Sequence, residues 1–164
     1  MRVRAGMRRF ERRVAAGESG VALVELALMI PMALVVFTGL LQVGVYENNS
    51  LELQNATGLA AEYLSVSRQP AGNSWDPCAL TVSAFQQVAP FLNTSNVTFT
   101  FAFQPKGAAS ATTYTGTTCT AGASVATQQG TAQVTATYPC SLAIYGRNLA
   151  PGCTLPAQVT EVIQ

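Results

Sequence analysis

The pattern of apolar and polar positions divides the chain into a long apolar segment, an amphipathic segment and an alternating region. Residues from Leu26 to Tyr46 are predominantly apolar and carry no charge. As an α-helix this stretch would be about 31 Å long, which matches the roughly 30 Å hydrocarbon core of a bilayer. We therefore expect residues 21–46 to form a transmembrane helix.

Beyond this segment, apolar residues recur at spacings of three and four. The stripe consists of Leu53, Ala56, Ala60, Tyr63 and Leu64. This spacing predicts an amphipathic continuation of the same helix over residues 47–68, with the stripe packed on the domain that follows. Residues 69–74 have turn chemistry and are expected to end the helix.

Residues 69–164 are expected to form a small exported domain. A short helix is predicted over 77–91, with Pro77 in its first turn. Apolar and polar residues alternate with the period of a β-strand in three segments: Asn96–Gln104, Gln133–Tyr138 and Ala157–Ile163. The expected fold class is α+β: a long N-terminal helix followed by one helix on a small antiparallel sheet.

Between these strands, residues 108–131 are rich in Ala, Ser, Thr, Gly and Gln. The few large apolar side chains in this segment cannot bury enough surface to offset the entropy lost when the chain becomes ordered. The pattern therefore predicts a long exposed loop or loose hairpin, with a short strand near Ser124–Gln128 as an option. Such a loop is a candidate adhesive or partner-contact surface, and a solvated loop without an assigned task is the alternative.

Charge is distributed unevenly about the apolar segment. Residues 1–20 carry six arginines and two glutamates, a net charge of +4, whereas residues 21–164 carry three basic and six acidic residues, a net charge of −3. By the positive-inside rule the N-terminus stays in the cytoplasm and the C-terminal domain is exported. We therefore expect a single-pass membrane protein.

The composition argues against several classes of function. The chain has no histidine, so histidine-dependent catalysis, histidine-ligated zinc and a histidine pH switch are excluded. Only 10% of its residues are charged. It has no phosphate-binding glycine loop, no nucleophile beside a base, and no basic patch in the exported part for nucleic acid. We predict a protein that is not an enzyme and uses neither a metal nor a cofactor.

One carboxylate lies within the apolar segment. Glu25 is the fifth residue after Gly20, and a carboxylate in a membrane helix costs about 2.5–3.5 kcal/mol at the bilayer centre and less toward an interface. Cleavage between Gly20 and Val21 would create an α-amine that is mostly protonated at neutral pH, one helical turn from Glu25. That amine, from the same chain or a neighbouring copy, is the natural counter-charge, and the pair would specify the register of packed helices.

Two other interpretations of the N-terminus compete with this one. A secretory signal peptide has an apolar region of roughly 7–15 residues and a small-residue cleavage site, and the segment here is longer and lacks such a site. An uncleaved single-pass anchor fits hydropathy alone; the protein would then be a membrane-tethered binding module or an envelope structural protein.

These residues resemble a known family. Gly20 with Val21–Glu25 is similar to the processing site of type IV prepilins, and Val24–Pro31 resembles the TadE-like minor pilins of the tight-adherence (Tad) pilus system. Leu53–Ala56, followed by Tyr63, is similar to the stretch after the membrane span in that family. The resemblance implies a pilin-like fold and a helix with a kink at Pro31.

The same resemblance implies a function. The chain would be a minor pilin or pseudopilin, with residues 1–20 as a cytoplasmic leader that a prepilin peptidase removes after Gly20. Its partners would be that peptidase, other pilin subunits and the inner-membrane assembly platform. After assembly in a pilus or pseudopilus, surface attachment or secretion would be the outcome.

All four cysteines lie in the part predicted to be exported: Cys78, Cys119, Cys140 and Cys153. No pair has C-x-x-C spacing, and two structural disulfides in an oxidising compartment fit best. Four cysteines allow three pairings. One of them, Cys140–Cys153 with Cys78–Cys119, would close a short loop and tie the helix to the Thr-rich loop; the sequence leaves the choice open.

Overall fold

The computed structural model describes residues 19–67, 75–140, 143–144 and 146–164. The chain divides into two compact units, Met1–Gln42 and Val43–Gln164. The predicted leader up to residue 18, Arg68 and the predicted turn over residues 69–74 lie outside the described residues.

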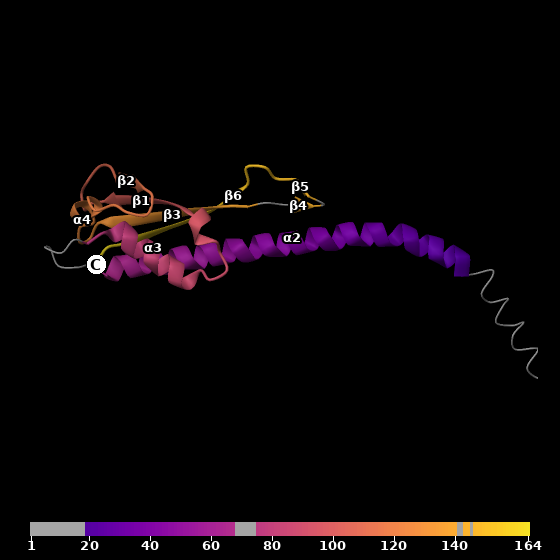
Figure 1. The fold of residues 1–164 in the computed structure, drawn as a ribbon. Helices are drawn as coiled ribbons and strands as arrows, with labels where there is room; N and C mark the ends of the chain where they lie inside the picture. Colours follow the sequence, from indigo (N-terminus) through magenta and orange to yellow (C-terminus); the bar gives the residue numbers. More distant parts are fainter. Residues whose placement is uncertain (1–18, 68–74, 141–142, 145) are drawn as a thin grey trace, which may run out of the picture. The chain divides into compact units, whose positions relative to one another are not determined.

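A single helix, α2, runs from Ser19 to Val66 and includes Pro31 (Figure 1). It covers the predicted transmembrane segment and nearly all of the predicted amphipathic extension without a break. In the C-terminal unit, four of the five stripe residues are buried in the core. The fifth, Tyr63, is 47% exposed. The long apolar helix followed by an α+β domain is the fold class expected from the sequence.

The C-terminal unit contains a four-stranded antiparallel sheet in the order β2-β1-β3-β6. The strands are β1 (Thr98–Gln104), β2 (Thr112–Thr115), β3 (Thr131–Pro139) and β6 (Thr154–Val162). The three strands predicted from alternation correspond to β1, β3 and β6. Strand β2 forms a hairpin with β1, in which Phe101 lies opposite Tyr114.

The core lies on one face of this sheet. Phe99, Phe101 and Phe103 of β1 are buried, and neighbouring positions of β3 and β6 carry small or aliphatic residues. Residues of α2 and α3 (Pro77–Val88) complete the same hydrophobic cluster. Because side chains alternate along a strand, the opposite face of the sheet carries mostly Thr and Gln.

Helix α3 begins where the sequence predicts and ends earlier. The carboxylate of Asp76 caps its N-terminus, and Pro77 occupies the first turn. The predicted end at residue 91 is wrong, because Ala89 precedes Pro90 and a residue before proline is disfavoured in the helical conformation. A 3₁₀ turn, η1 (Thr94–Asn96), then leads into β1, so this strand begins two residues later than predicted.

The segment 108–131 is more ordered than predicted. Besides β2 it contains the short helix α4 (Gly122–Val125), which replaces the strand considered near Ser124–Gln128. A Cβ atom on Gly122 would lie 2.9 Å from Sγ of Cys119 and 3.3 Å from Cε2 of Phe103, so the glycine permits a close approach to the core. The expectation of a loose loop is therefore wrong: the segment is held by a disulfide and by buried small residues, and needs few large side chains.

Two disulfides are present, Cys78–Cys119 and Cys140–Cys153. They are the pairing that closes the short loop and joins α3 to the Thr-rich segment. Beyond Cys140, a two-stranded ribbon of β4 (Ala143–Ile144) and β5 (Arg147–Asn148) was not anticipated from the sequence, because two-residue strands carry no periodic signal.

Candidate assembly segment and disulfide cluster

The candidate processing junction lies near the start of the described part of α2. Gly20 and Val21 are both helical and exposed, and a Cβ atom on Gly20 would meet nothing within 4 Å. Cleavage between these two residues stays a prediction.

Glu25 lies four residues after Val21 in a continuous helix, and both residues are exposed. Residues four apart share one helix face, and the rise between them is about 6 Å. An α-amine on Val21 would thus emerge on the same face as the Glu25 carboxylate. The pairing of the two groups stays a prediction.

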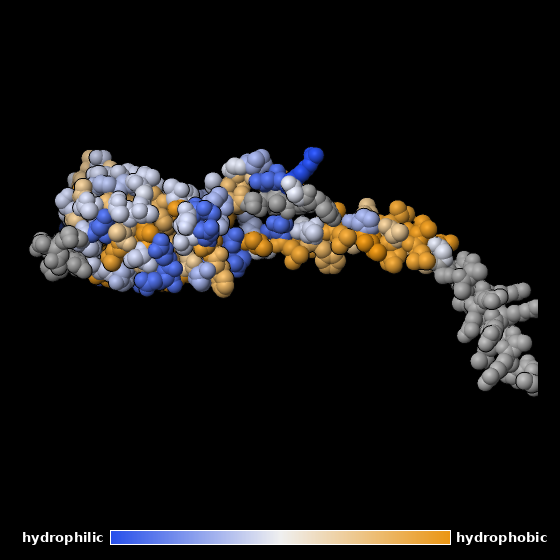
Figure 2. Space-filling model, viewed as in Figure 1, coloured by the Kyte–Doolittle hydropathy of each residue, from blue (hydrophilic) through white to orange (hydrophobic). Residues whose placement is uncertain are grey.

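The surface around Glu25 is apolar and has no partner in the described chain. Every residue from Gly20 to Val36 is exposed, and Glu25 is the one charged residue between positions 20 and 46. By length and composition, α2 contains a segment able to cross a membrane. Figure 2 shows this segment as an almost continuous apolar surface on the face in view.

Pro31 lies eleven residues after Gly20, within the same helix. A proline cannot donate a backbone hydrogen bond, so the carbonyl of Ala27 loses its usual partner. A kink at Pro31 stays a prediction. Thr38, by contrast, satisfies its own hydroxyl by donating to the carbonyl of Leu34 at 2.8 Å.

The N-terminal helix was compared with models of known protein families. The family model described as TadE-like protein matches residues 20–62. This segment is TadE-like. The match confirms the resemblance carried by the sequence motifs. No curated protein and no solved structure matches the chain.

The TadE-like segment begins at Gly20 and contains Val21, Glu25 and Pro31, whereas all four cysteines lie beyond it. A TadE-like segment on an apolar N-terminal helix fits a membrane protein related to the Tad pilus. The helix fits a single-pass anchor. The family match accordingly bears on the apolar helix and its amphipathic extension, and the sheet of the C-terminal unit has to be interpreted from its own residues.

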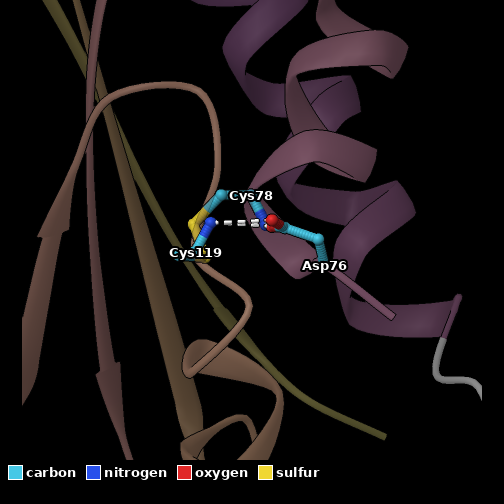
Figure 3. Close-up of side chains that lie close together, drawn as sticks. All are labelled: Asp76, Cys78 and Cys119. Atoms are coloured by element: carbon cyan, nitrogen blue, oxygen red, sulfur yellow. Dashed lines mark hydrogen bonds between the residues drawn. A yellow bond between two sulfur atoms is a disulfide. The ribbon is translucent and has the colours of Figure 1, made fainter. Parts of the chain in front are cut away.

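In the C-terminal unit, Asp76 links α3 to the segment that follows β2. Its Oδ1 accepts hydrogen bonds from the backbone N–H groups of Cys78 and Ala79, each at 3.0 Å. Both carboxylate oxygens lie 2.9 Å from the N of Cys119. Figure 3 shows the carboxylate beside the Cys78–Cys119 disulfide, so that one covalent and one polar cross-link join the same two segments.

Carboxylate and sulfur atoms of Asp76, Cys78 and Cys119 lie within 4.8 Å of one another, a grouping that resembles a metal site. Both sulfurs are used in the disulfide, however, and metal binding by cysteine requires the thiolate. The carboxylate already accepts from three N–H groups. The chemistry of this donor set is therefore that of a structural clamp.

Sequence reasoning missed two roles of acidic residues. Asp76 is not among the residues for which a role was predicted, although an Asp directly before a Pro at a helix start is a capping signal. Glu52 accepts a hydrogen bond from the N–H of Phe91 at 2.8 Å, across 39 residues. No local pattern predicts such a contact.

Proposed function

We propose that this protein is a type IV prepilin, a minor pilin or pseudopilin of a Tad-like apparatus. It is inserted with the arginine-rich leader in the cytoplasm, cleaved after Gly20 and assembled through its N-terminal helix. The observation that carries the proposal is Glu25, the one charged residue of an otherwise apolar and unpartnered segment, one helical turn after Val21.

Electrostatics supports a role for Glu25 in assembly. An isolated carboxylate in hydrocarbon is unfavourable, and a protonated amine at hydrogen-bond distance offsets part of that cost. A neighbouring helix displaced by one turn would leave both charges unpaired, so the pair selects one register. The benefit of the pair is thus greater for specificity than for stability.

The remaining parts of the proposal follow from the topology. The basic leader favours a cytoplasmic N-terminus in a bacterial inner membrane, with the disulfide-bonded domain in the oxidising compartment outside. The partners are a prepilin peptidase, other pilin subunits and an inner-membrane assembly platform. The protein serves as substrate and building block, without catalytic activity of its own, in surface attachment or secretion.

Mass spectrometry and N-terminal sequencing of the protein extracted from its native membrane test the cleavage. We expect the chain to begin at Val21. A chain that retains residues 1–20 would contradict the proposal and would favour an uncleaved membrane-tethered binding module.

The role of Glu25 is tested by Glu25→Ala, with Glu62→Ala as a matched control on an exposed position of the same helix. Glu25→Ala should leave membrane insertion and leader removal intact and abolish the incorporation of the protein into filaments. Glu62→Ala should behave as the parent does. Normal incorporation of Glu25→Ala would remove the role assigned to this carboxylate.

A further inference from the structure

A groove in the exported unit contains a carboxylate that is only partly satisfied. The groove lies between α2 and the end of α3, has a volume of about 320 Å³, and is lined by residues that include Leu51, Glu52, Val88 and Phe91. Oε1 of Glu52 accepts from the N–H of Phe91, whereas Oε2 is buried and has no hydrogen-bond partner among the described residues.

The groove has exposed apolar side chains beside polar ones. Phe91 is 82% exposed and Leu51 is 58% exposed, and Asn48 and Asn55 also line the groove. A carboxylate that lines a groove beside exposed apolar side chains is complementary to a cation that stands beside an apolar residue.

The chain itself carries a cation beside an apolar residue. In the described part of the exported unit the basic residues are Lys106 and Arg147, and Lys106 donates to Gln129. Arg147 lies on β5, is exposed, and follows a turn in which Gly146 has φ +77°. Leu149, two residues further on, is 63% exposed. The ribbon thus presents a guanidinium and an apolar side chain together.

Groove and ribbon lie at the same end of the exported unit. Gln54 of α2 lies beside Pro156–Val159 of β6, and the carbonyl of Ser65 accepts from the N–H of Gln164, so α2 and β6 run in the same direction. Glu52 is therefore near the beginning of β6. The Cys140–Cys153 disulfide closes that same end, and the β4–β5 ribbon follows it.

We propose that the Glu52 groove of one copy receives Arg147 and Leu149 of a second copy. The guanidinium pairs with the Glu52 carboxylate, and Leu149 covers Phe91. The two surfaces are different, so the contact is heterologous and can repeat from copy to copy into an open array. The inference rests on the proposed function only for the alignment of copies in one membrane or filament.

Photo-cross-linking of the full chain in the membrane tests this contact. Phe91 is replaced by the photoreactive analogue benzoylphenylalanine in one tagged copy, and a second copy with a different tag is co-expressed. Illumination should join the two tags, and mass spectrometry should locate the attachment within residues 146–150 of the second copy. Attachment to a different protein only, or to another part of the second copy, would overturn the proposal.

Charge variants make the test specific. Arg147→Glu in the second copy and Glu52→Gln in the first should each lower the cross-linked yield, the former by about tenfold. Arg147→Lys should retain most of it, and Lys106→Glu serves as the matched control and should leave it unchanged. Glu52→Gln keeps the acceptor for Phe91, and Arg147 is on an exposed ribbon, so neither change threatens the fold. Parent yield with Arg147→Glu, or an equal loss with Lys106→Glu, would overturn the proposal.

The same membranes are analysed for the mass of the chain. Cross-linking of copies that retain residues 1–20 would support the contact and contradict the proposed cleavage. Absence of cross-linking between copies that begin at Val21 would overturn the contact and leave the prepilin proposal standing.

Discussion

Replacement of Asp76 by Ala tests the clamp between α3 and the segment that follows β2. The change removes the N-terminal cap of α3, worth about 1 kcal/mol. It also removes the acceptor for the N–H of Cys119, a residue that is 6% exposed, and an unpaired buried N–H costs about 1–3 kcal/mol. The unfolding free energy of the C-terminal unit should therefore fall by about 2–4 kcal/mol.

The assay is thermal unfolding of the full chain in detergent micelles, followed by near-ultraviolet circular dichroism, with both disulfides intact. For a unit of this size we expect Tm to fall by about 4 °C per kcal/mol, hence by about 8–16 °C. Asp76→Asn retains one acceptor oxygen without the charge. Its Tm should fall by about half as much as that of Asp76→Ala, because hydrogen bonds to charged groups are roughly twice as strong as those between neutral groups.

Ser83→Ala is the matched control, because its exposed hydroxyl bonds only to the carbonyl of Leu80 within α3. Its Tm should stay close to that of the parent. A Tm of Asp76→Ala within about 2 °C of the parent would refute the clamp. A fall in the parent Tm on addition of a chelator would show instead that the carboxylate belongs to a metal site.

Three further predictions concern the C-terminal unit and use the same thermal assay. Loss of the Cys78–Cys119 disulfide, with a sequence separation of 41, should lower the free energy of unfolding by about 4 kcal/mol. Loss of Cys140–Cys153, with a separation of 13, should lower it by about 3 kcal/mol, because a shorter loop restrains the unfolded chain less. Equal Tm values in oxidised and reduced protein would contradict this. Gly122→Ala should lower Tm, since its Cβ atom would overlap the core, whereas Gly58→Ala, with nothing within 4 Å in the interior of α2, should raise stability by about 0.5–1 kcal/mol. Phe101→Ala should cost about 3–5 kcal/mol and Phe91→Ala almost nothing, because the first side chain is fully buried and the second is 82% exposed; a similar Tm for both would contradict the assigned core.

The sequence was most informative where one period persisted over many residues. The apolar segment and its stripe predicted α2, and the alternation of Phe99, Phe101 and Phe103 predicted β1 and its buried face. These patterns record burial directly, because a helix or strand with one covered face must repeat its apolar residues with its own period.

Where order comes from contacts across the chain, local patterns fail. Strand β2 is four residues long at the edge of the sheet and has one large partly buried side chain, Tyr114, so its pairing with β1 leaves almost no trace in the sequence. Helix α4 depends on the disulfide of Cys119 and on the close approach of Gly122 to the core. The same holds for Glu52, whose partner Phe91 is brought close only by packing of α3 on α2.

Because α2 is part of the core, it decides how the C-terminal unit can be prepared on its own. Leu53, Ala56, Ala60, Ala61 and Leu64 are each about 1% exposed within the same hydrophobic cluster as β1. A recombinant fragment that starts after the long helix, at Trp75, would uncover the aromatic residues beneath it and should precipitate. A fragment intended for crystallisation or binding assays has to begin no later than Glu52, so that it retains the last turns of α2 as an integral layer.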